Sequence, residues 1–236
     1  MKRRTVLKFR TSGAMARFAA GLLKKALRGK RPGPLLAALS GGRTPAPLLK
    51  VLAESGTDWS RAHFFMADER LVPAGSPDSN FGQARRLFFS KIRIPEANLH
   101  RVKGSAPGRA AAAYEKEIVK TAGPAGAFDI IFLGLGGDGH TASVFPGSPA
   151  LSENKKLVLP VSAPGKIKPR QRITLTLKAL NSAATVVLMA SDRSKKPVFA
   201  RAAAGDATIP AGRLRPRGKL YLLFSEKTEL KRTRTP

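Results

Sequence analysis

An apolar segment that leads directly into a glycine-rich turn constrains this chain most. Residues 130–135 are rich in β-branched and aromatic side chains, which is typical of a strand buried in a parallel sheet. Four glycines let the backbone turn sharply or approach a ligand there: Gly134, Gly136, Gly137 and Gly139. Two ionisable residues, Asp138 and His140, lie on the same turn. Because ligands bind at the carboxyl ends of strands in open α/β sheets, we expect an active site here.

Predicted strands and helices alternate along the rest of the chain. Apolar runs predict strands at residues 5–9, 34–39, 63–66, 157–161, 173–177, 185–190 and 219–224. Amphipathic patterns predict helices at residues 14–27, 46–53, 81–91, 110–121 and 195–204. We therefore expect an α/β fold with a Rossmann-like, mainly parallel sheet and helices on both faces. No repeat or long linker divides the sequence, which favours a single domain over residues 1–236 with a frayed tail at 226–236.

The charge balance is unusual. The chain has 43 Lys and Arg residues against 15 Asp and Glu residues, a net charge of +28. Such a balance suggests nucleic acid, an anionic surface or anionic substrates as partners. The cations are spread along the whole chain, however, and aromatic residues make up only 6% of it, too few for an evident base-stacking platform. We expect weak, non-specific polyanion binding rather than specific nucleic-acid recognition.

Composition also limits the chemistry and the location. The chain has no cysteine, which excludes disulfides, a thiolate nucleophile and zinc–thiolate sites. No apolar stretch approaches the roughly 20 residues of a membrane helix, so we expect no membrane segment and a cytoplasmic protein. The basic residues 1–31 resemble a transit peptide, but a predicted strand and helix occupy most of them. We therefore expect no targeting segment.

A small, glycine-rich turn follows the predicted strand at residues 34–39. It consists of Ser40, Gly41, Gly42, Arg43, Thr44 and Pro45. A strand, such a turn and a helix with proline in its first turn are typical of a phosphate cradle, because free N–H groups and the positive helix end favour an anion. The turn lacks the P-loop lysine pattern and the G-x-G-x-x-G spacing, so a nucleotide is not indicated. Taken alone, a tight turn without a ligand explains it equally well.

Two further clusters of charge stand out. Asp68, Glu69 and Arg70 follow the predicted strand at residues 63–66, either as functional groups or as a surface ion pair. A later loop holds four cations in seven residues: Lys166, Lys168, Arg170 and Arg172. These cations would either clamp a phosphate or form a solvated basic loop, the default in so basic a chain. We expect His100, in a connector, to be solvated.

These motifs together resemble the 6-phosphogluconolactonase family of the sugar-phosphate isomerase/deaminase-like superfamily. The matching segments are Ser40-Gly41-Gly42-Arg43-Thr44-Pro45, Asp68-Glu69-Arg70-Leu71-Val72-Pro73, Ser79-Asn80, residues 134–146 and Arg172-Ile173-Thr174-Leu175-Thr176. They occur in the family's order and spacing and cover about residues 5–225. The chain departs from the family in two places. Only Pro169 remains of several prolines before Arg172, and Arg43 replaces a small polar residue.

The resemblance implies hydrolysis of 6-phospho-D-glucono-1,5-lactone to 6-phospho-D-gluconate, the second step of the oxidative pentose phosphate pathway, without a metal or other cofactor. It makes His140 the general base, with Asp138 either orienting it or capping the turn, and Arg70 the stabiliser of negative charge. The implied substrate-binding residues are Ser40, Gly41, Gly42, Arg43, Thr44, Asp68, Glu69, Asn80, Gly137, Lys168 and Arg172. Lys166 is an alternative to Lys168. The partner is then a phosphorylated sugar lactone, and the protein a monomer or homodimer.

Three other functions fit the sequence less well. An amino-sugar-phosphate deaminase usually has a glutamate shortly after the histidine, whereas residues 141–148 contain no acid. Its counterpart of Asp68-Glu69-Arg70 also usually ends in an aromatic residue. A sugar-phosphate-sensing regulator would need an N-terminal helix-turn-helix of several dozen residues, and we expect none here because the first cradle is already reached at Ser40. A basic nucleic-acid module would leave Asp138 and His140 unexplained.

Overall fold

The computed structural model describes residues 4–29 and 33–227. Within them, seven strands form one parallel sheet in the order β1-β10-β9-β6-β2-β3-β5. The strands are β1 (Arg4–Thr11), β2 (Leu35–Leu39), β3 (Ala62–Met66), β5 (Leu99–His100), β6 (Ile130–Gly134), β9 (Thr185–Ser191) and β10 (Lys219–Lys227). This sheet confirms the predicted Rossmann-like α/β fold. Residues 228–236 of the predicted frayed tail lie outside the described residues, and residues 226–227 belong to β10.

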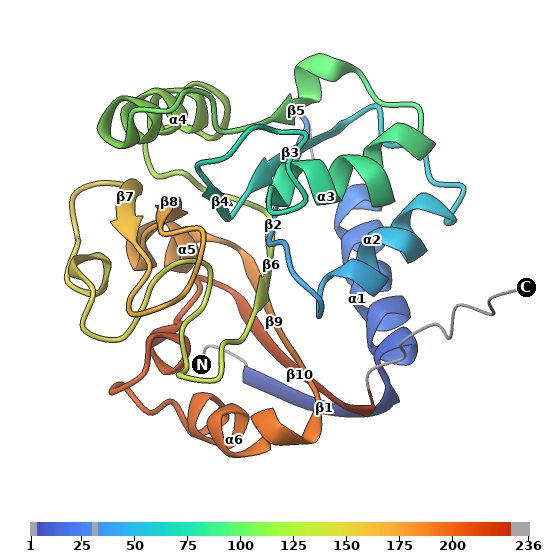
Figure 1. The fold of residues 1–236 in the computed structure, drawn as a ribbon. Coiled ribbons are helices and arrows are strands. Elements are labelled where there is room, and N and C mark those ends of the chain that lie inside the picture. The colour runs from blue at the N-terminus through green and yellow to red at the C-terminus, as the bar shows by residue number, and fades with distance from the viewer. Residues whose placement is uncertain (1–3, 30–32, 228–236) are drawn as a thin grey trace, which may run out of the picture.

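Helices cover both faces of the sheet (Figure 1). One face carries α1 (Ser12–Arg28), α2 (Ala46–Ala53) and α3 (Asn80–Leu87). The other carries α4 (Pro107–Ala122), α5 (Leu177–Ser182) and α6 (Lys196–Ala204). Each layer packs on its own apolar core, because the central strands are buried on both sides. No helix within residues 4–29 and 33–227 is long and apolar enough to span a membrane.

A second sheet lies beside the first on the side of α4 and α5 (Figure 1). It is antiparallel, in the order β4-β8-β7, with β4 at Asp68–Arg70, β7 at Val158–Ser162 and β8 at Gln171–Leu175. The predicted strand at residues 173–177 ends early because Thr176 caps α5: its hydroxyl accepts a hydrogen bond from the backbone N–H of Ala179. The small sheet thus holds Asp68–Arg70 above the large one.

The expectation that His100 is solvated was wrong. Leu99–His100 forms the edge strand β5, which pairs with β3, and the His100 side chain is buried. Its Nε2 lies 2.9 Å from Nδ1 of His63, and its Nδ1 lies 2.7 Å from a carboxylate oxygen of Glu117 in α4. The ring also stacks on Phe65. Two polar partners and one aromatic face make burial of the imidazole favourable.

Candidate active site

A cavity of about 390 Å³ lies at the carboxyl ends of β2, β6 and β9. Residues of β4 and β8 form one of its walls. It brings together most of the residues predicted from sequence: Ser40, Gly41, Gly42, Arg43, Thr44, Asp68, Arg70, Asn80, Gly137, His140 and Arg172. Asp138, Glu69 and Lys168 do not line it. In the described ranges, no cluster of three or more His, Asp or Glu side chains has the geometry of a metal site.

His140 and Asp138 form a hydrogen-bonded pair at the mouth of the cavity. Nδ1 of His140 lies 2.5 Å from Oδ1 of Asp138, which also accepts the backbone N–H of His140 at 3.1 Å. Partial burial tends to raise the pKa of Asp138, but the hydrogen bonds and charge of His140 outweigh it and lower that pKa. Asp138 is therefore a carboxylate at neutral pH. Because Asp138 occupies Nδ1, Nε2 is the nitrogen that His140 offers to a ligand.

The glycine turn holds this pair by close packing. A Cβ on Gly136 would collide with the His140 ring and with Asp138. Gly139 has a positive φ of 87°, and a Cβ there would lie 2.7 Å from Cβ of Ile209. The backbone N–H of Gly136 donates to the carbonyl of His140 at 2.9 Å, which closes the turn. The turn therefore requires glycine for space at both positions and for conformation at Gly139.

The turn after β2 forms the opposite wall. Ser40 is buried, and its hydroxyl has no hydrogen-bond partner among the described residues. The backbone N–H of Gly42 donates to the side chain of Gln83 at 2.7 Å, so it is already engaged. Asn80 packs so closely under the turn that a Cβ on Gly41 would overlap its side chain. The turn that forms the predicted cradle is thus fixed to α3, while the Ser40 hydroxyl stays buried.

Asp68 and Asn80 form a buried polar network below the cavity. The Asn80 amide donates to the backbone carbonyl of Asp68 at 2.8 Å, and the Ser143 hydroxyl donates to the Asp68 carboxylate at 2.6 Å. Ser143 follows the glycine turn, and Asn80 begins α3. The network therefore joins three separate segments of the chain at one point of the site.

Glu69 has a different role from its neighbours. Its carboxylate accepts the backbone N–H groups of Arg70, Asn80 and Phe81 at 2.7–2.8 Å, and the Ser79 hydroxyl at 3.2 Å. Burial nevertheless raises its pKa, against the effect of these hydrogen bonds. A carboxylate at the start of α3 is favoured by the positive end of the helix. Glu69 therefore fixes α3 to β4 and does not face the cavity.

Arg70 and Arg172 face each other across the small sheet. They are register partners in the antiparallel strands β4 and β8, and both line the cavity. Burial is the main cause that lowers the pKa of Arg172; Asp68 opposes the shift and Arg70 adds to it. In the part of the chain that the structure describes, neither guanidinium forms an ion pair with a carboxylate. Two like charges held opposite each other favour a bound anion between them.

Sequence reasoning missed Lys195. It lies just after β9, lines the cavity, and donates a hydrogen bond to the backbone carbonyl of Leu135. Burial, and then the nearby Arg43, lower its pKa. A usable signal was present, because a cation after the carboxyl end of a central parallel strand falls on the ligand-binding edge.

The loop before Arg172 lies outside the cavity. Lys166 and Lys168 are both exposed, and neither lines the cavity walls. Only the backbone of the loop reaches the site, where the carbonyl of Pro169 accepts a hydrogen bond from Nε of Arg172 at 3.0 Å. The loop therefore orients Arg172 through its backbone.

Comparison with known proteins places this geometry in a family. The family model described as glucosamine-6-phosphate isomerases/6-phosphogluconolactonase matches residues 10–222. The chain belongs to this family. A 6-phosphogluconolactonase from Synechocystis sp. is 38% identical over 199 residues, which are 80% of this chain and 81% of that protein.

Solved structures agree with that assignment. The crystal structure of a 6-phosphogluconolactonase from Thermotoga maritima is 30% identical and has a TM-score of 0.84, over 95% of this chain and all of that one. A 6-phosphogluconolactonase from Trypanosoma cruzi is also 30% identical, with a TM-score of 0.85 over 95% of this chain and 96% of the other. These matches confirm the resemblance to 6-phosphogluconolactonases that the sequence motifs indicated.

Proposed function

We propose that this chain is a 6-phosphogluconolactonase that hydrolyses 6-phospho-D-glucono-1,5-lactone to 6-phospho-D-gluconate. The observation that carries the proposal is one cavity that contains a histidine oriented by Asp138 and two arginines, neither of which forms an ion pair with a carboxylate of the described residues. Hydrolysis of a lactone needs a nucleophilic water and a stabilised oxyanion, and this cavity supplies a group for each. Relatives described as 6-phosphogluconolactonases match 80% of this chain at 38% identity and, in a solved structure, 95% of it at 30% identity.

In the proposed reaction, Nε2 of His140 removes a proton from a water as the water oxygen attacks the lactone carbonyl. The carbonyl oxygen becomes an oxyanion, which Arg70 stabilises. The tetrahedral intermediate then collapses: the bond from the carbonyl carbon to the ring oxygen breaks, and the imidazolium of His140 returns its proton to that oxygen. Asp138 keeps the proton on Nδ1 and stabilises the imidazolium between the two steps. His140 and water suffice for this sequence, so we propose that it is metal-independent.

The phosphate of the substrate is proposed to lie on the Ser40–Thr44 turn, between Arg172 and Lys195. The hydroxyl of Ser40 has no partner in the described chain, and the two cations lie on the cavity wall. Arg43 is exposed at the rim and lowers the pKa of Lys195 through its charge. A bound dianion would relieve this repulsion, because opposite charges favour each other most in a partly buried site.

A deaminase on the same fold is the alternative, since the family model covers both activities. Two observations favour the lactonase. Residues 141–148 contain no acid that would assist ring opening, and position 70 is a cation suited to an oxyanion. Release of ammonia from glucosamine 6-phosphate is the assay that separates the two functions.

The first experiment compares lactone hydrolysis by wild type and His140→Ala, using freshly prepared 6-phosphogluconolactone and subtracting spontaneous hydrolysis. General-base catalysis contributes about 10²–10⁴-fold, so kcat should fall by that order with KM little changed. Activity in the presence of EDTA tests metal independence in the same assay. A folded wild-type protein with no rate above background would refute the proposed function.

The second experiment tests the phosphate assignment with Arg172→Gln and Lys168→Gln. A hydrogen bond to a charged group contributes about 1.5–3 kcal/mol, so Arg172→Gln should raise KM about tenfold to a hundredfold while kcat changes less. Lys168→Gln removes the same charge outside the cavity and should leave KM within about twofold. Equal effects of both substitutions would refute this assignment and indicate that the basic loop binds the phosphate.

Other parts of the proposal concern the protein as a whole. We propose one domain over residues 1–236, a cytoplasmic location that fits a phosphorylated sugar substrate, and either a monomer or a homodimer. We also propose that polyanions bind only weakly and without specificity, since few aromatic residues are present to stack on bases. A gel shift that disappears at physiological salt would be consistent with this.

A further inference from the structure

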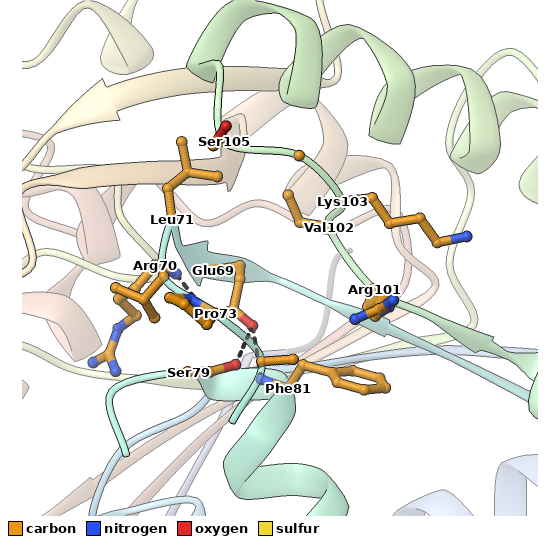
Figure 2. A pocket seen from close by; sticks show the side chains of 13 residues that line it. Glu69, Arg70, Leu71, Pro73, Ser79, Phe81, Arg101, Val102, Lys103 and Ser105 are labelled. Carbon is orange, nitrogen blue, oxygen red and sulfur yellow. Dashed lines mark hydrogen bonds between the residues drawn. The ribbon is translucent and has the colours of Figure 1, made fainter. Parts of the chain in front are cut away.

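A second cavity, of about 330 Å³, is lined by residues of β4 and of the segment after it (Figure 2), and Arg70 belongs to the walls of both cavities. One wall is the segment after β4, which includes Leu71 and Pro73. The other wall is the loop between β5 and α4, which includes Arg101 and Val102, and the ring of Phe81 closes one end. The proposed reaction does not use this space.

The walls of this second cavity are mainly apolar, but its rim is basic. Leu71, Val72, Pro73, Phe81 and Val102 provide the apolar surface. Arg101 and Lys103 stand exposed on the loop at one side. Within residues 4–29 and 33–227, no hydrogen bond or ion pair engages either cationic group.

The charge of Arg70 is not part of this rim. Arg70 is one of the lining residues, but Figure 2 shows its guanidinium pointing away from Arg101 and Lys103. There it donates to the backbone carbonyl of Asp78 at 2.6 Å. The only nearby carboxylate on the wall, that of Glu69, is fully engaged with the start of α3. The rim cations Arg101 and Lys103 therefore stand against one lining carboxylate, whose oxygens already accept hydrogen bonds.

From this combination we propose that the second cavity binds an amphipathic organic anion, a small molecule with an apolar body and one phosphate, sulfonate or carboxylate group. The body would pack between Leu71 and Val102, and the anionic group would lie on Arg101, with Lys103 adding to the local positive charge. An apolar pocket with a few polar groups that fix orientation is the usual form of a small-molecule site. Bidentate recognition of an oxyanion is the chemistry to which arginine is best suited.

The second cavity and the active-site cavity share β4, because Arg70 lines both of them. The bound molecule would contact the chain directly after Arg70, and Glu69 ties the same strand to α3. A ligand that shifts β4 would change the position of the Arg70 guanidinium.

The test titrates the full-length protein with 8-anilinonaphthalene-1-sulfonate, a probe with a flat apolar body and one sulfonate, and follows its fluorescence. The variants are Arg101→Gln, which removes the rim cation, and Ala74→Phe, which fills the cavity. Arg43→Gln is the matched control, because it removes one exposed cation from the rim of the active-site cavity. Circular dichroism and thermal unfolding verify that each variant is folded.

We expect saturable one-to-one binding to wild type and to Arg43→Gln. Arg101→Gln should weaken binding at least tenfold, consistent with loss of a charge-assisted hydrogen bond of about 1.5–3 kcal/mol, and Ala74→Phe should abolish it. Binding that is not saturable, or that Arg43→Gln weakens as much as Arg101→Gln, would overturn the proposal. Because the readout is binding, the result does not depend on the proposed lactonase activity.

Discussion

At the scale of single residues, neighbouring carboxylates in this chain have separate tasks because their surroundings differ. Glu69 is buried, and its carboxylate accepts three backbone N–H groups, which fixes the start of α3 to β4. Asp68 instead accepts the Ser143 hydroxyl beneath the cavity. Asp138 is part-exposed and bound to an imidazole, which is the arrangement of a residue that orients a base.

The Asp138–His140 pair leads to a prediction about the carboxylate. Asp138→Asn keeps the size of the side chain but removes the charge that stabilises the imidazolium, and its amide also permits the wrong tautomer of His140. We expect kcat to fall about 10²-fold or more with KM nearly unchanged, measured by lactone hydrolysis. Asp138→Glu, which retains a carboxylate, should keep more activity than Asp138→Asn. If the two variants are equally impaired, the role of the charge is refuted.

At the scale of elements, the site depends on turns that follow parallel strands. The turn after β6 carries His140, the turn after β2 carries Ser40, and the segment after β9 carries Lys195. Parallel strands end at the same edge of a sheet, so residues far apart in sequence meet there. The antiparallel pair β4 and β8 adds the arginines from the side.

The turn after β6 leads to a prediction about its glycines. In Gly136→Ala, the new methyl group would overlap the His140 ring and displace it from Asp138. We expect a loss of kcat of about tenfold to a hundredfold in a protein that still folds, since a displacement of about 1 Å can cost that much. Gly21→Ala is the control, because a Cβ there meets no protein atom within 4 Å and Gly21 lies in α1, outside the walls of the cavity, so the pair should stay intact. Its kcat should stay within about threefold of wild type; a loss as large as that of Gly136→Ala would contradict this explanation.

At the scale of the whole molecule, net charge is the dominant feature. The chain carries +28, and few of its exposed cations pair with an acid in the part that the structure describes. Repulsion among them destabilises the compact state, and the apolar cores on the two sides of the sheet must outweigh it.

This repulsion predicts that salt stabilises the protein. Raising NaCl from 10 to 150 mM shortens the screening length from about 30 Å to about 8 Å, which weakens repulsion between distant cations. We expect Tm to rise by several degrees, measured by calorimetry at constant pH in a phosphate-free buffer. Arg172→Gln should retain most of the increase, because the effect arises from the whole surface. A Tm that is independent of salt would show that repulsion is negligible.

The sequence by itself determined the fold class and predicted most of the residues that line the candidate active-site cavity. The alternation of apolar runs with helical patterns predicts the parallel sheet, because both periodicities are local. The glycines around Asp138 and His140 predict a turn at a strand end, because residues without a Cβ allow the backbone to turn sharply. The ordered motifs likewise indicate the family from the sequence alone.

Tertiary structure alone decided which side chains meet. The register of β4 and β8 sets Arg70 opposite Arg172, strand order brings Lys195 to the cavity, and the path of its loop leaves Lys168 outside. The burial of His100 in an edge strand could likewise not be predicted from the sequence, because a strand of two residues is too short to show a periodic pattern. Such encounters depend on register and strand order, which are long-range properties that no local pattern in the sequence encodes.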